Sequence, residues 1–157
     1  MKQLDSAALD LLATAAADSP RRRANRNLHD DLADPVQRLA IAMEPDTKVL
    51  PHRHPQTFEL LFPLRGRFLV LHFDEAGVVV QRTILGEDCR LVENPAGVWH
   101  AVLSLDPGGV IFEVKHGPYA PVGAADTAPW ARDRSAAEEE KLLAWYVVAR
   151  IGERWGG

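Results

Sequence analysis

The segment HRHPQTFELLFPLRG, residues 52–66, places metal-ligating residue types directly before a run of strand-forming residues. His52 and His54 are two residues apart, so an extended chain directs both imidazoles to the same side. Glu59 has the opposite parity, and a turn at residues 55–57, which contains a proline and two polar residues, can return it toward that side. We therefore expect the two histidines and the glutamate to converge from consecutive extended segments.

A second segment, PAGVWH at residues 95–100, supplies a fourth donor. Its Pro-Ala-Gly turn leads His100 into another predicted strand. Three neutral imidazoles and one carboxylate suit a divalent Fe, Mn, Co, Ni or Zn ion, whereas Ca²⁺ and Mg²⁺ prefer oxygen ligands. An ion that takes more than four ligands would keep positions open for water or a chelating substrate. A closed structural zinc site is the alternative, and the residue types leave the choice of metal open.

The sequence around these segments alternates between short apolar runs and turn residues from 36 to 116. The runs are rich in β-branched and aromatic residues, and no helical period separates them. They cover residues 39–43, 58–64, 68–73, 78–85 and 110–114. Many short strands at close spacing indicate an antiparallel sandwich or barrel, and we predict a jelly-roll barrel.

Helices are predicted at both ends of this β region. Apolar residues at helical spacing favour a helix within residues 1–19. Residues 20–35 show neither the helical nor the strand periodicity of apolar residues, and we predict that they form an ordered arm. A Pro- and Ala-rich linker covers residues 117–134, and Ser135 with Glu138 offers a capping signal for a second helix over 135–152. A chain of 157 residues suits one core, so we expect a single domain over residues 1–157.

The spacings His52-x-His54-x4-Glu59-x6-Gly66 and Pro95-x-Gly97-x2-His100 resemble the two sequence motifs of the cupin superfamily. The outer motif positions differ, with Asp46 and Cys89 in place of opening glycines and Ser104 in place of a closing asparagine. None of these three is a predicted ligand. The resemblance implies an all-β fold, an antiparallel jelly-roll (cupin) barrel with an N-terminal and a C-terminal helix, and a metal held by the two histidines, the glutamate and His100.

Within that superfamily the chain resembles the WbuC-type cupin metalloproteins over nearly its whole length. The resemblance rests on three stretches, Arg23-x-Asn25-x-Asn27-Leu28-His29, Asp34-Pro35-Val36-Gln37-Arg38 and Phe112-Glu113-Val114-Lys115-x-Gly117-Pro118-Tyr119. It implies sugar-related chemistry only by association with bacterial surface-polysaccharide gene clusters, and it implies no particular reaction.

Five residues outside the metal motifs are candidates for contact with a substrate. Asn25 and Asn27 could close the arm over the barrel mouth, or their amides could satisfy backbone groups in a surface loop. His29 is the candidate for proton transfer if the arm reaches the site. Arg38 could anchor an anionic substrate or pair with a surface carboxylate. Tyr119, just beyond the last strand, could line the opening.

The leading hypothesis is a metal-dependent enzyme that acts on a small polar metabolite, such as a sugar-derived or carboxylated one. Isomerase, lyase and oxygenase reactions are all compatible with the ligand set, so enzymatic activity is left open. A non-catalytic binding or sensing protein is the main alternative. Two further alternatives are a metal-free sugar epimerase and a protein whose metal serves stability alone.

Composition narrows the choice of partners and compartment. The net charge is −4, and the run Arg21-Arg22-Arg23 is too short for a nucleic-acid surface. No apolar run approaches the roughly 20 residues of a membrane span, so no membrane association is expected. The single cysteine and the lack of a secretory leader favour the cytoplasm. A homodimer is expected, because the apolar C-terminal helix could cover a sheet edge.

Overall fold

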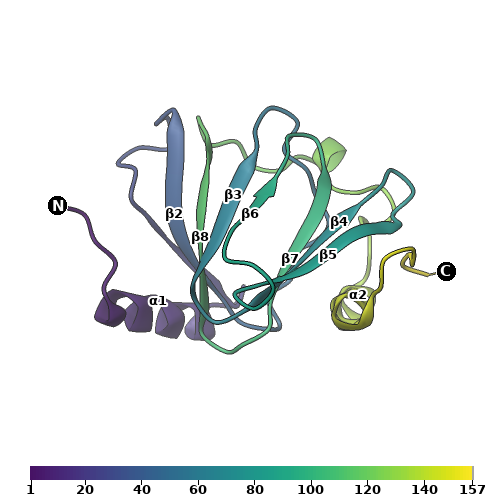
Figure 1. Cartoon of the computed structure of the whole chain (residues 1–157), viewed down its shortest axis with the longest axis horizontal. Helices are drawn as coiled ribbons and strands as arrows, with labels where there is room; N and C mark the ends of the chain where they lie inside the picture. Colours follow the sequence, from purple (N-terminus) through teal and green to yellow (C-terminus); the bar gives the residue numbers. More distant parts are fainter. Residues whose placement is uncertain (157) are drawn as a thin grey trace.

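The computed structural model describes residues 1–156, which form two antiparallel sheets flanked by two helices (Figure 1). The larger sheet has the strand order β1 (Arg23–Asn27), β2 (Val36–Met43), β8 (Gly109–His116), β3 (Glu59–Arg65) and β6 (Val92–Asn94). The smaller sheet has the order β5 (Val79–Leu85), β4 (Phe68–Phe73) and β7 (Trp99–Ser104). The helical elements are α1 (Ser6–Asp18), the short 3₁₀ helix η1 (Ala124–Asp126) and α2 (Ala136–Val148). The expected β-rich fold with a helix at each end is confirmed.

The two sheets form a β-sandwich, and the predicted jelly-roll barrel is not closed. Within residues 1–156, no strand ladder joins the five-stranded sheet to the three-stranded one. The edge strands are β1 and β6 in the larger sheet and β5 and β7 in the smaller one. Closure requires continuous hydrogen bonding between the edge strands of the two sheets, which is absent within the described residues.

The predicted arm contains a regular strand, β1, which extends the five-stranded sheet beside β2. Arg23 pairs with Met43, and Asn27 pairs with Leu39. Ala24, of the opposite parity, packs in the cluster beneath α1. The inward face of β1 is polar because it borders a cavity, so the apolar alternation expected of a strand is missing from this stretch.

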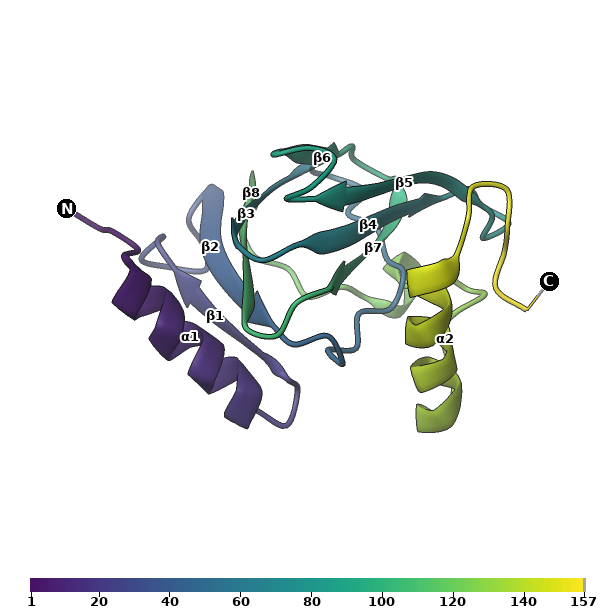
Figure 2. The same cartoon turned by 60° about the horizontal axis from the view of Figure 1, so that its bottom comes forward.

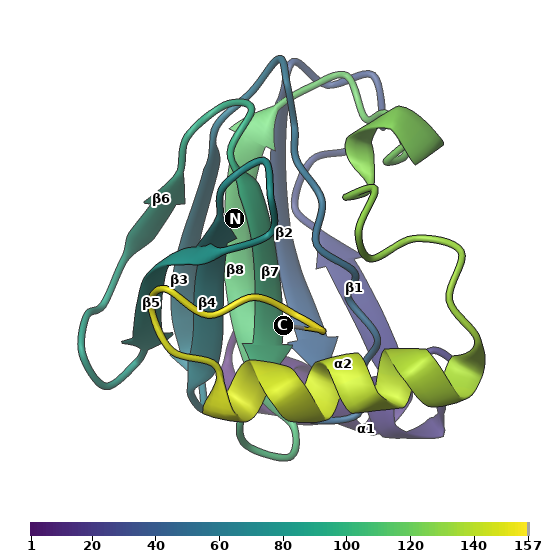
Figure 3. The ribbon, with the colours of Figure 1, turned by 90° about the vertical axis from the view of Figure 1, so that its right-hand side faces the viewer.

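The helices cover different sheets (Figures 1 and 2). Leu12 and Ala16 of α1 are buried against β1 and β2. Leu142 and Tyr146 of α2 belong to the core cluster of the three-stranded sheet, and Figure 3 shows α2 lying across one end of the strands. The predicted cap of α2 is confirmed, since Ser135 and Glu138 form a capping box. No helix among the described residues is long and apolar enough to cross a membrane.

Candidate metal centre

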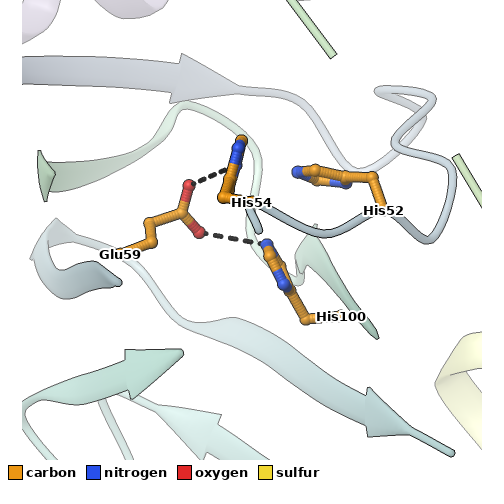
Figure 4. A group of neighbouring side chains, drawn as sticks. All are labelled: His52, His54, Glu59 and His100. Carbon is orange, nitrogen blue, oxygen red and sulfur yellow. Dashed lines mark ion pairs between the residues drawn. The ribbon is translucent and has the colours of Figure 1, made fainter. Parts of the chain in front are cut away.

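The four predicted metal ligands lie together, at a point where the two sheets approach one another (Figure 4). Their ligand atoms all lie within 4.8 Å of one another. Glu59 begins β3 of the five-stranded sheet, and His100 lies on β7 of the three-stranded sheet. His52 and His54 come from the connection between β2 and β3. A backbone bridge fixes His52 to His100, with N–H to O distances of 2.9 and 2.8 Å.

Backbone carbonyls orient two of the imidazoles. His52 Nδ1 lies 2.9 Å from the Leu50 carbonyl oxygen, and His100 Nδ1 lies 2.9 Å from that of Val98. A carbonyl oxygen can only accept, so each Nδ1 carries the proton and each Nε2 presents a lone pair. A hydrogen bond from the second ring nitrogen is how proteins orient metal-binding histidines.

The ring nitrogens that face Glu59 fit a metal better than they fit a hydrogen-bond network. His54 Nε2 lies 3.4 Å from Glu59 Oε1, and His100 Nε2 lies 3.3 Å from Glu59 Oε2. Both nitrogens are buried, and neither makes a hydrogen bond of acceptable geometry. Unsatisfied buried polar atoms are costly, and a cation bound among three imidazoles and a carboxylate would satisfy them.

Burial and neighbouring charged or polar groups determine the protonation of His52 and Glu59. Burial lowers the pKa of His52 from 6.5 to about 3, so this ring is neutral at ordinary pH. Burial raises the pKa of Glu59, but contacts with His100, His54 and Lys115 more than offset that effect and hold it well below its usual value. The cluster therefore combines a neutral imidazole with an anionic carboxylate, the forms in which these side chains bind metals.

A polar row across the five-stranded sheet supports Glu59. The strand register places Lys115 of β8 and Asn94 of β6 on either side of it. Asn94 Nδ2 donates to Glu59 Oε2 at 3.0 Å, and Asn94 Oδ1 accepts from His72 Nε2 at 2.7 Å. Lys115 Nζ lies 3.7 Å from Glu59 Oε1. The sequence patterns predict no role at the site for Asn94, His72 or Lys115.

Glu113 also lies on this inner face and was not predicted as a site residue. It is buried, and its Oε1 lies 2.8 Å from Lys115 Nζ. Burial, with a further contribution from Glu59, raises the pKa of Glu113 to about 7. In the sequence, Glu113 and Lys115 are two residues apart and follow Ile111 at the same spacing, so all three fall on one face of a strand. This spacing is the signal that could have identified Glu113.

A cavity of about 570 Å³ lies beside the cluster and contains most of the other predicted site residues. Asn25, Asn27 and His29 line it from the β1 side, and the half-exposed Tyr119 lines its mouth. Asn25 Nδ2 donates to Asn27 Oδ1 at 2.9 Å. Arg38 is not among the lining residues, because its parity on β2 turns it away from the cavity.

The backbone of Arg38 positions the buried His29 ring. The Arg38 side chain pairs with Asp34 at 2.6 Å. His29 Nδ1 lies 2.9 Å from the Arg38 amide nitrogen and 3.0 Å from the Arg38 carbonyl oxygen, so these contacts accommodate either tautomer of the ring. His29 Nε2 is buried and has no partner among the described residues. This nitrogen is therefore a polar atom available to a ligand in the cavity.

Comparisons with solved structures show the fold. KdgF from Halomonas sp. is 13% identical with a TM-score of 0.51, over 66% of this chain and 85% of that one. BH2720 from Bacillus halodurans is 19% identical with a TM-score of 0.53, over 71% and 82% of the two chains. A recombinant oxalate oxidase in complex with glycolate is 16% identical with a TM-score of 0.53, over 68% and 57%. At 13–19% identity, these similarities show a shared fold.

The sequence itself was also compared with known proteins. No curated protein matches it. The family described as "Domain of unknown function (DUF6016)" matches residues 4–85, which is more than half of the chain, and the protein therefore belongs to this family.

Proposed function

We propose that this protein binds one divalent transition metal ion through His52, His54, Glu59 and His100 and uses it to act on a small polar metabolite. The observation that carries the proposal is the pair of buried, unsatisfied imidazole nitrogens that face Glu59 beside the cavity. A bound divalent ion would supply Lewis-acid polarisation of a ligand oxygen.

The surrounding residues prepare this site for a ligand. Asn94 and Lys115 hold the Glu59 carboxylate in place, and the Leu50 and Val98 carbonyls hold two imidazoles. His29 Nε2 provides a buried polar atom without a partner among the described residues in the cavity wall. Such preorganised groups are what a metal-dependent enzyme requires for binding and orienting its substrate.

The finer assignment to the WbuC-type cupins forms part of the same proposal. All three stretches behind that resemblance supply cavity residues. They are Arg23, Asn25, Asn27 and His29 in the first, Gln37 in the second, and Glu113, Lys115 and Tyr119 in the third. Residues shared with that group are thus concentrated where a ligand would bind.

Elemental analysis of the untagged protein tests the metal site. The wild type is expected to carry about one equivalent of Fe, Mn, Co, Ni or Zn, and the double variant His52→Ala/His54→Ala to lose it. A His116→Ala variant is the matched control, since His116 is exposed and outside the cluster. No bound metal in the wild type, even after anaerobic reconstitution, would contradict the proposal.

Visible absorption of the Co²⁺-loaded protein tests for open coordination positions. Lactate, a 2-hydroxy acid that chelates metals, is expected to change the cobalt spectrum. An unchanged spectrum at a high lactate concentration would indicate that the metal has no open coordination position and is structural. Ligand binding without turnover of any candidate substrate would instead favour a sensing protein.

A further inference from the structure

Arg23 reaches the cavity from the N-terminal strand. It lies opposite Met43 in the register of β1 and β2, and both side chains line the cavity. The side chain is partly buried, and burial lowers the pKa of the guanidinium, while Glu113 and Glu59 act in the opposite direction. The charged group is therefore withdrawn from water on the wall that faces the metal cluster.

Arg23 has no side-chain hydrogen bond or ion pair within residues 1–156, whereas three other basic residues near it are paired. Arg22, of opposite parity, pairs with Asp46 at 3.1 Å. In the cavity wall, Lys48 pairs with Glu139 at 3.1 Å and Lys115 with Glu113 at 2.8 Å. A partly desolvated guanidinium without a partner loses its hydration and gains no compensating contact. The N–H donors of the Arg23 guanidinium are therefore available to a ligand.

The rest of the cavity favours a negative charge on that ligand. Arg21, two residues before Arg23, also lines the cavity and has no side-chain partner among the described residues. The acidic side chains in the wall are Glu59, a metal ligand, and Glu113, which Lys115 already pairs. A divalent cation would add to the positive charge. Between these charged ends the wall is apolar, with Leu39, Ile41 and Leu61 among its residues.

We propose that the ligand of this cavity carries a carboxylate or phosphate group that binds the Arg23 guanidinium, while chelating oxygens at its other end face the metal cluster. Planar, bidentate recognition of an oxyanion is the geometry for which arginine is suited. The proposal rests on the proposed function, because it assumes that the cluster holds a metal with open positions.

Matched pairs of 2-hydroxy acids test the proposal on the full-length, Co²⁺-loaded protein by isothermal titration calorimetry at constant ionic strength. Lactate and malate differ by one distal carboxylate, and glycerate and 3-phosphoglycerate differ by one phosphate. The wild type is expected to bind the second member of at least one pair roughly 10- to 100-fold more tightly than the first. The pair that shows the preference identifies the anion as a carboxylate or a phosphate.

Arginine variants link that preference to Arg23. Arg23→Met keeps the length of the side chain and is expected to lose the preference while binding cobalt and lactate as the wild type does. Arg23→Lys keeps the positive charge but lacks the planar set of guanidinium N–H donors, so it should lose part of the preference. If Arg23→Met does not fold, Arg23→Lys still tests the role of the guanidinium. Arg26→Met removes an exposed arginine of opposite parity from the same strand and should change nothing.

The possible failures are distinguishable. A wild type that binds both members of each pair equally, or an Arg23→Met variant that retains the preference, would overturn the role of Arg23 and leave the metal site intact. A cobalt-loaded wild type that responds to none of the four acids would instead overturn the proposed function.

Discussion

Asn94 links the candidate metal ligand Glu59 to His72. Its amide donates to Glu59 and accepts from His72, so one side chain fixes the carboxylate and satisfies a buried ring. The clustering of His52, His54, Glu59 and His100 could be predicted because their residue types and spacing are typical of a metal site. Asn94, Lys115 and Glu113 could not be assigned, because their positions depend on which strands lie side by side.

The Asn94→Ala variant is expected to bind its metal about 10- to 100-fold more weakly, because Glu59 loses its supporting hydrogen bond. Competition between the protein and a chromophoric chelator measures this change. Glu93→Ala alters an exposed residue on the same strand and should leave the affinity unchanged. Equal affinities for Asn94→Ala and the wild type would show that Glu59 does not need this contact.

At the scale of elements, the sequence predicted the two helices and most strands but missed β1 and the three-residue β6. Apolar periodicity and a capping box identify an element that packs on a core, as α2 does. The strand β1 instead turns Arg23, Asn25 and Asn27 toward the cavity and so lacks the apolar signal. The opposite face of β1 carries both Ala24 and the exposed Arg26, so polar and apolar residues do not alternate along this strand.

Leu142→Ala should destabilise the protein by about 2–5 kcal/mol, because Leu142 is fully buried between α2 and the three-stranded sheet. Urea unfolding monitored by circular dichroism measures the change. Val148→Ala on the same helix, where the side chain is 67% exposed, should shift the free energy of unfolding by less than about 0.5 kcal/mol. Similar losses in the two variants would contradict this account of how α2 packs.

For the whole molecule, the sequence predicted antiparallel β structure but not whether the sheets close. The runs of β-branched and aromatic residues mark individual strands, and turn residues mark their ends. Closure depends on whether the edge strands β1 and β6 of one sheet pair with β5 and β7 of the other, which the apolar runs of the individual strands do not encode. Hydrophobic patterning alone does not distinguish a sandwich from a barrel.

Acid should destabilise the metal-free protein through His52. Its folded pKa, about 3, lies below the unfolded value of 6.5, so the unfolded chain binds more protons between these values. The stabilisation is complete above pH 6.5 and is lost as the pH falls toward 3. The stability of the wild type relative to His52→Gln should therefore drop by about 1.4 kcal/mol for each pH unit below 6.5.

Urea unfolding in the presence of a chelator, at several pH values between 7.5 and 4.5, measures this difference. The comparison with His52→Gln is necessary because His100, whose pKa is raised through its contacts with Glu59 despite burial, contributes with the opposite sign. Parallel pH profiles for the two proteins would show that His52 is not the group responsible.

Glu59 comes from the five-stranded sheet and His100 from the three-stranded sheet, and within residues 1–156 no strand ladder joins those sheets. A metal bound by both residues would link the two sheets and would stabilise the folded chain by mass action. Because several divalent ions suit this ligand set, the ion found in the purified protein would depend on which metals were available during expression. Expression in media of defined metal content is therefore part of identifying the native metal.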